Sequence, residues 1–354
     1  MVVKKFLIAL TIGSVGLLVA QDLAWSQTPP KVKVGTVRAT TIGAVVSAKE
    51  KGYFKEAGID VDIELIDASA AFVPALATNA LNVVEGGVSA SLFNGILQGL
   101  PIKSAFDSTS TPINHYLMRR PDLAEKYKSI KDLKGAVVAV NAPSSIALYE
   151  VTKLLETEGL SIKDVEVKVI PFAQMGIAFQ TKAIEVGLQI TPFASTLEQQ
   201  GIATRWISSD RTLRPTPVQI STSMYNTDWA AQNPKVAQAF FTQLLRGARD
   251  YCNAYHGGSY RPELLKLLVA NGVAPSTDIL DKILWPARNP DGHVFKESMT
   301  DVLKWYVGQG LVRSEIPIDQ VVNDQFAAEA VKQLGAFKLE NTSSELGGCG
   351  RPQP

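Results

Sequence analysis

KVKVGTVRATTIGAVVSAKEKGYFKEAGIDVDIEL, residues 31–65, is the stretch that decides the fold. It begins with a β-rich run at 31–36, continues with helical periodicity over 42–51 that stops at Gly52, and alternates with period two at 59–65. A strand, a helix and a second strand in this order are typical of a βαβ unit, whose strands lie parallel in one sheet. We therefore predict an α/β fold.

The same alternation continues to Phe106 and is repeated in a second cycle that begins near His115. This repetition predicts two lobes, each a mostly parallel sheet flanked by helices. After Asp228 the pattern changes to amphipathic helices, which close little core by themselves and so must pack on lobe one as a C-terminal block. The remaining predicted strands are 83–85, 102–106, 115–119, 136–140, 166–170, 186–190, 204–207 and 218–224. The remaining predicted helices are 71–79, 91–97, 147–158, 177–183, 197–200, 234–254, 262–270, 276–284, 296–308 and 319–333.

The first residues have the pattern of an export signal. Two lysines at 4–5 precede an apolar run at 6–20, and a polar stretch follows. This order is typical of a secretory signal peptide, and the small residues Ala24 and Ser26 predict cleavage before Gln27, with cleavage after Ala20 as the alternative. An uncleaved anchor would need roughly 18 apolar residues. We therefore predict a periplasmic protein, and we expect no lipid anchor because no cysteine follows the apolar run.

Charge and cysteine content argue against several kinds of partner. Removal of Lys4, Lys5 and Asp22 with the signal peptide takes the formal net charge from +1 to zero, which argues against a nucleic-acid partner. The three histidines and two cysteines stand at no ligand spacing, so we predict neither a metal site nor a cofactor. Cys252 and Cys349 could form a disulfide in an oxidising compartment or remain two unrelated thiols.

Three short motifs follow one another along the first half of the chain. EKGYFKEAGIDV at 50–61 ends the first helix, SIKDLKGAVVAV at 129–140 begins the second lobe, and LLETEGLSIKDV at 154–165 ends the helix that follows. Together they resemble signatures of the ABC-importer substrate-binding proteins of the nitrate, sulfonate, taurine and pyrimidine-precursor group. The resemblance covers roughly 31–333 and implies a two-lobed type II periplasmic-binding fold that closes on a ligand about a hinge. It also implies an inner-membrane ABC permease with its ATPase as partner, and we expect a monomer.

These patterns also predict the boundaries of the lobes. The signal peptide occupies 1–26, lobe one takes 27–111 and 218–338, lobe two takes 112–217, and 339–354 form a flexible tail. Lobe one is divided because the strand at its second segment returns to the first unit. The tail is assigned as flexible because it is polar and rich in glycine.

Two segments depart from the family pattern. Members of the family usually have an acidic "g.vDa" motif where this chain has EVGLQ at 185–189, and a similar departure occurs at LNVVE, 81–85. Both segments precede predicted cleft loops. The departures therefore indicate a ligand outside the family's standard set.

Five loops rich in serine and threonine are predicted to line the cleft, because ligands bind at the carboxyl ends of parallel strands. Hydroxyls and helix-start amides can cradle an anion, although the same residues are also ordinary helix caps. Arg38 could pair with a carboxylate or sulfonate or remain a solvated residue. Phe193 and Tyr149 could stack on a ligand or belong to the core. The predicted ligand-binding residues are Arg38, Thr40, Thr41, Gly87, Ser89, Ser91, Ser108, Thr109, Ser144, Ser145, Thr191 and Phe193.

These observations predict a receptor that binds a small-molecule ligand, an organic anion or a heterocycle such as a sulfonate, carboxylate or pyrimidine-like compound, and delivers it to the permease. Two alternatives remain. A periplasmic sensor subunit that signals to a membrane kinase would share the fold. An enzyme is the other, since a related branch of the fold makes the thiamin pyrimidine with a Cys-rich motif and His. This chain has no such cluster and no G-x-S-x-G elbow, which argues against an enzyme.

Overall fold

The computed structural model describes residues 29–66 and 71–352 of the chain. The predicted signal peptide therefore lies outside the described residues. Within these two ranges, the helices are all too short or too polar to cross a membrane.

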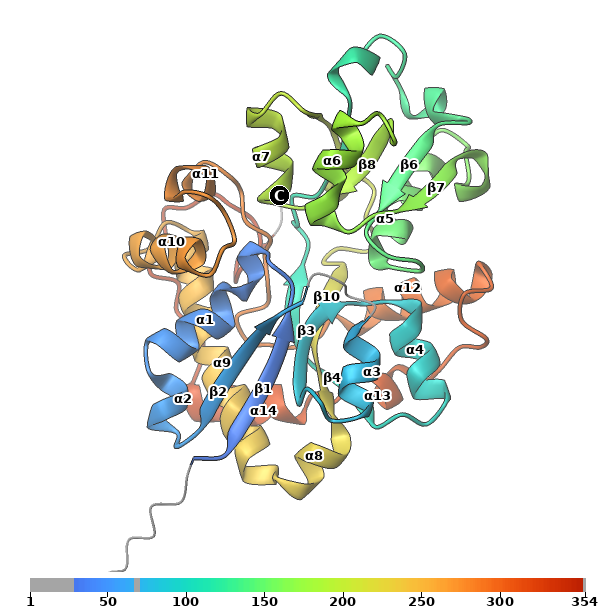
Figure 1. Ribbon diagram of the computed structural model, residues 1–354. Coiled ribbons are helices and arrows are strands. Elements are labelled where there is room, and N and C mark those ends of the chain that lie inside the picture. The colour runs from blue at the N-terminus through green and yellow to red at the C-terminus, as the bar shows by residue number, and fades with distance from the viewer. Residues whose placement is uncertain (1–28, 67–70, 353–354) are drawn as a thin grey trace, which may run out of the picture.

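The strands form two five-stranded sheets, which lie one above the other in Figure 1. Lobe one contains β1 Lys31–Thr36, β2 Asp60–Leu65, β3 Val83–Gly87, β4 Ile102–Ser110 and β10 Gln219–Asn226, in the order β2-β1-β3-β10-β4. Lobe two contains β5 Tyr116–Arg119, β6 Val137–Val140, β7 Glu166–Val169, β8 Val186–Gln189 and β9 Thr204–Ser208, in the order β7-β6-β8-β5-β9. The predicted α/β fold with two lobes is confirmed.

The stretch 31–65 forms the predicted βαβ unit. β1 and β2 pair in parallel, with Val32 opposite Val61. Between them lie α1 Gly43–Glu50 and α2 Tyr53–Glu56. The helical segment is divided at Gly52, whose φ of 77° is the left-handed conformation that glycine adopts without steric cost.

Each sheet also contains antiparallel pairs, so the sheets are mixed. β10 runs antiparallel to β3 and β4, and β5 runs antiparallel to β8 and β9. β10 follows the return from lobe two, so it begins at the cleft edge where β1, β3 and β4 end. The chain crosses between the sheets at 111–115 and at 212–218, and the lobe boundaries expected at 111/112 and 217/218 stay predictions.

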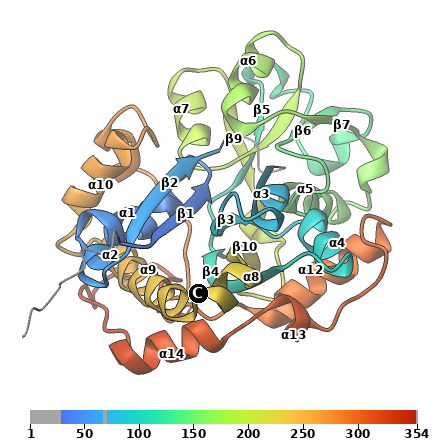
Figure 2. The same ribbon diagram turned by 60° about the horizontal axis from the view of Figure 1, so that its bottom comes forward.

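Helices cover both faces of the lobe-one sheet (Figure 2). Neighbouring residues Val83 and Val84 are both fully buried and belong to different core clusters, because successive strand side chains point to opposite faces. On one face α1 packs so closely against α9 (Pro234–Tyr255) that a Cβ at Gly247 would lie 2.1 Å from the Ala44 carbonyl oxygen. The remaining helices are α3 Phe72–Ala77, α4 Ala90–Leu97, α5 Ile146–Glu156, α6 Met175–Gln180, α7 Phe193–Gln199, α8 Thr227–Gln232, α10 Arg261–Ala270, α11 Thr277–Asp281, α12 Lys296–Gly308, α13 Ile318–Val321 and α14 Gln325–Leu334.

The predicted helix at 319–333 is wrong in one respect, because it is two helices. Val322 bridges to Ser104 on the edge strand β4, and the Asn323 amide donates to the Ser104 carbonyl over 2.8 Å. These bonds satisfy backbone groups that a continuous helix would have paired internally. Packing against a sheet edge therefore overrides the helical periodicity. The sequence also missed α8 and placed the start of α7 four residues late.

The polar tail was predicted to be flexible, and this is corrected by its contacts with α9. The Tyr255 hydroxyl donates to the Gly347 carbonyl over 2.7 Å, and His256 Nδ1 lies 2.8 Å from Ser344 Oγ. Cys349 and Cys252 are both buried, and both are free thiols. Burial raises the pKa of the Cys252 thiol well above its ordinary value. The tail is held because its glycines let the chain turn onto α9, which the composition did not reveal.

Candidate functional site

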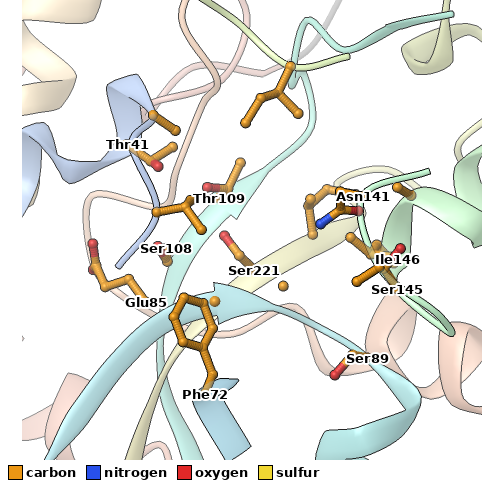
Figure 3. A pocket seen from close by; sticks show the side chains of 18 of the residues that line it. Thr41, Phe72, Glu85, Ser89, Ser108, Thr109, Asn141, Ser145, Ile146 and Ser221 are labelled. Atoms are coloured by element: carbon orange, nitrogen blue, oxygen red, sulfur yellow. The ribbon is translucent and has the colours of Figure 1, made fainter. Parts of the chain in front are cut away.

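A cavity of about 300 Å³ lies between the two lobes and takes its walls from both. Figure 3 shows Thr41, Glu85, Ser108 and Thr109 from lobe one facing a space that Ser145 and Ile146 border from lobe two. The walls combine hydroxyls at strand ends with large apolar side chains. The apolar members include Val37, Phe72, Val73, Ile146, Phe172, Ile190, Ile220 and Met224.

Most of the predicted ligand-binding residues lie in this wall. Their contact with a ligand stays a prediction, but the fold brings them together from five separate loops. The predicted residues that line the cavity are Thr41, Gly87, Ser89, Ser91, Ser108, Thr109, Ser145 and Thr191. The predicted residues that do not line it are Arg38, Thr40, Ser144 and Phe193.

The residues outside the wall have other positions. Arg38 is directed to the turn after α10, where a Cβ on Gly272 would lie 2.8 Å from Arg38 Nη1. Ser144 accepts a hydrogen bond from the Ala90 amide over 3.2 Å, which joins the two lobes. Phe193 is the first residue of α7. The cation that sequence reasoning offered for an anionic ligand is therefore directed elsewhere.

Glu85 in β3 is a wall residue that sequence reasoning missed. The residue is only 4% exposed. Ser223 Oγ donates to its Oε1 over 3.1 Å, and the Arg288 guanidinium lies 4.0 Å from the same oxygen. Its Oε2 accepts no hydrogen bond from any described residue. Burial raises the pKa of Glu85, and Arg288 and Ser223 act in the opposite direction.

Asp107 in β4 is a second buried carboxylate near Arg288, and its surroundings differ. Gln219 Nε2 donates to Oδ1 over 2.6 Å, while Ser110 Oγ and the Asn289 amide donate to Oδ2 over 2.8 and 2.6 Å. Burial raises its pKa to about 6. Asp107 does not line the cavity. Both of its oxygens are occupied, so its role is to hold the strand ends in place.

Glu150 in α5 is the buried carboxylate of the lobe-two wall. His115 Nδ1 donates to both of its oxygens over 3.1 Å, and Ser209 Oγ donates to Oε2 over 2.8 Å. Glu150 and His115 both line the cavity. Nearby, Ser145 Oγ and Thr191 Oγ1 are buried without a hydrogen-bond partner among the described residues. Lobe two therefore offers hydroxyls, whereas its carboxylate is already satisfied.

The two departures from the family pattern were signals that could have revealed part of this wall. Glu85 is the last residue of the departure at 81–85 and stands between apolar residues and glycines. Gln189 ends the other departure, and its Nε2 donates over 2.8 Å to the carbonyl of Phe172, a wall residue. A charged or amide residue inside an otherwise buried strand indicates a specific partner, because isolated burial of polar groups is costly.

Among residues 29–66 and 71–352, there is no group of three or more His, Cys, Asp or Glu side chains that could hold a metal ion. The cavity wall is organised for hydrogen bonds and apolar contacts.

Comparisons with known proteins identify the family and the fold. The family model described as NMT1/THI5 like matches residues 39–254. No curated protein sequence matches the chain. The periplasmic nitrate-binding protein NrtA from Synechocystis PCC 6803 superposes with a TM-score of 0.72 at 15% identity, covering 91% of this chain and 92% of that chain. The alkanesulfonate-binding protein SsuA from Xanthomonas axonopodis pv. citri, bound to MOPS, gives 0.69 at 17% identity, covering 84% and 100%.

A desulfurization enzyme, DSZB, also shares the fold, with a TM-score of 0.64 at 14% identity over 86% of this chain and 99% of that chain. At these identities the neighbours show the fold alone, which is that of type II periplasmic binding proteins. The site and its chemistry must therefore be argued from this chain's own residues.

Proposed function

This chain belongs to the NMT1/THI5-like family, and on that premise we propose that it is the exported solute-binding component of an ABC importer. It captures a small organic molecule between its lobes in the periplasm and delivers it to an inner-membrane permease with its ATPase, acting as a monomer. The observation that carries this proposal is the cavity of about 300 Å³, because both lobes build it and the described part of the chain crosses between them at two places.

Contacts across the cleft support a closing motion. The Ala90 amide at the start of α4 donates to the Ser144 carbonyl, and the Tyr149 hydroxyl of α5 donates to Asp301 Oδ2 of α12 over 3.3 Å. The Tyr149 ring also packs edge-on against Trp305 of lobe one. These contacts would break when the lobes open, so binding energy from a ligand can decide between open and closed forms.

The enzyme alternative receives less support from the site. The cavity wall contains serines and His115, but the side-chain hydrogen bonds of His115 run to Glu150 and not to a wall serine. Nucleophilic catalysis needs the hydroxyl within hydrogen-bond reach of its base. Both cysteines lie outside this wall, in α9 and the tail.

The proposal is tested by ligand-dependent stability and by uptake. A panel of sulfonates, carboxylates, nitrate and pyrimidines, together with a metabolite extract, is added to the purified protein. A ligand at 100 times its Kd is expected to raise the free energy of unfolding by about 2.7 kcal/mol. A strain lacking the gene should lose uptake of that ligand. The proposal fails if neither the panel nor the extract shifts the unfolding transition.

A periplasmic sensor subunit would also bind a ligand, so the partner must be identified separately. Permease and ATPase genes beside this gene are expected for a transporter, whereas a sensor-kinase gene beside it would favour signalling. Normal uptake in the deletion strain together with altered transcription would likewise favour the sensor.

A further inference from the structure

We propose that Glu85 selects the ligand, and that this ligand is an uncharged or cationic molecule with an apolar body and an N–H or O–H donor that binds Glu85 Oε2. The inference rests on the proposed function, since it assigns the ligand class of the same cavity. It excludes the sulfonates, carboxylates and nitrate that a cleft of hydroxyls would otherwise suggest.

The first argument is the state of the Glu85 carboxylate. Oε1 has a donor in Ser223 and a cation in Arg288, whereas Oε2 has no partner among the described residues. A buried polar atom without a partner costs about 1–3 kcal/mol, and more when the group is charged. A ligand donor would remove that cost on binding, and a ligand without one would keep it.

The second argument is the charge of the wall. Among the described residues that line the cavity, none is lysine or arginine, while Glu85 and Glu150 both are wall residues. Arg288 stands behind the wall, and its Nη2 donates to the Ser108 and Thr41 carbonyls over 2.5 and 3.3 Å. An anion would therefore face two carboxylates, with no lysine or arginine among the described wall residues, in surroundings where charges are weakly screened.

The third argument is the shape and polarity of the remaining surface. Phe72 lies beside Glu85 in Figure 3, and Ile220 and Met224 lie on the neighbouring strand β10. A volume of about 300 Å³ accommodates a ring-sized molecule whose body is buried by these side chains. On the opposite wall, the unpartnered hydroxyls of Ser145 and Thr191 can bind a second polar group of the ligand.

A series of ligands with one body and different head groups tests the inference. Benzamidinium, benzamide, benzoate and benzenesulfonate share a phenyl ring and differ in charge and in donors. Calorimetry and thermal unfolding are measured with each of the four on the purified protein, freed of copurified ligand by unfolding and refolding. Benzamidinium and benzamide are expected to bind at least tenfold more tightly than either anion. Tighter binding of benzoate or benzenesulfonate would overturn the inference.

Two variants separate the role of Glu85 from a general effect of buried charge. Glu85→Gln keeps the size of the side chain and is expected to reduce the preference for benzamidinium over benzamide at least tenfold. Asp107→Asn removes the other carboxylate near Arg288, outside the cavity wall, and should change that preference less than threefold. Equal loss in both variants, or none in Glu85→Gln, would contradict the assignment. If Glu85→Gln does not fold, the wild-type series still decides.

The charge of a ligand captured from a metabolite extract separates the two proposals. Mass spectrometry of the compound released by unfolding is expected to show a neutral or cationic molecule with an N–H or O–H group. A captured acid that is anionic at neutral pH would overturn the role of Glu85 and leave the receptor function standing. If the wild type captures nothing from the extract and binds none of the four probes, the receptor function itself fails.

Discussion

Each of the two walls of the cavity contains a buried carboxylate, and the two carboxylates differ in how fully they are hydrogen-bonded. In lobe one, Glu85 keeps one oxygen without a partner, whereas in lobe two both oxygens of Glu150 are held by His115 and Ser209. A buried carboxylate with both oxygens hydrogen-bonded stabilises the fold, whereas an oxygen without a partner is able to accept a hydrogen bond from a ligand. The proposal therefore assigns ligand selection to lobe one and closure over the ligand to lobe two.

The largest effect is expected from removal of the Glu150 carboxylate, whose two oxygens are both hydrogen-bonded. Glu150→Ala leaves His115 and Ser209 buried without their partner, which should lower the free energy of unfolding by about 4 kcal/mol. Urea unfolding followed by circular dichroism measures the loss. Glu150→Gln, which keeps the shape and one acceptor oxygen, is the matched control and should lose less than half as much. Equal unfolding midpoints for Glu150→Ala and wild type would refute the structural role of this residue.

Asp107, the third buried carboxylate near the cavity, should make the stability of the protein depend on pH. Its pKa is raised from 3.8 to about 6 in the folded protein, so the native state keeps a proton that the unfolded chain has already released. The corresponding stability is present in full below pH 3.8 and is lost as the pH rises through 6. The loss should amount to about 3 kcal/mol.

Asp107→Asn should remove this slope. The free energies of unfolding of wild type and variant are measured by urea titration from pH 4 to pH 7. The value for wild type should fall relative to that of the variant as the pH rises. A difference that stays constant over that range would show that Asp107 titrates normally.

A disulfide between the two cysteines would link the C-terminal tail covalently to α9 of lobe one. Cys252 and Cys349 are adjacent in the fold, and a disulfide between them stays a prediction. Oxidised glutathione can accept the two electrons and two protons released. The bridge is expected to stabilise the protein by about 3 kcal/mol. Intact mass and thiol alkylation after unfolding report the bond, and Cys252→Ser should show no gain with the oxidant. Thiols that remain fully alkylated after oxidation would count against it.

The smallest effect is expected at the contact between the lobes. Tyr149→Phe removes the hydrogen bond to Asp301 and should shift the balance between closed and open forms by about 1 kcal/mol. Small-angle scattering without ligand should show a larger radius of gyration. Tyr306→Phe is the control, because Tyr306 bonds to the Val88 carbonyl within lobe one. An equal expansion in both variants would argue against a specific role of Tyr149 in closing.

Local patterns in the sequence predicted most of the fold. Period-two and helical runs predicted β1, α1 and β2, and α12 matches its predicted range at 296–308. The division between α13 and α14 was missed, since Ser104 on β4 supplies the competing hydrogen bond from more than two hundred positions away. The tail was also missed, because the partners that hold it lie in α9.

What the sequence by itself determined is the class of protein, the loops that meet at the cleft and most of their hydroxyl residues. Those features depend on spacing between near neighbours. The hydrogen bonds and charges of the site were decided only by the tertiary structure. The partners of Glu85 Oε1 are Ser223, 138 positions away in the sequence, and Arg288. Likewise Arg38 looked like the ligand's cation until the fold directed it to the turn at Gly272. Whether a buried charge is satisfied or open depends on partners that only packing brings together.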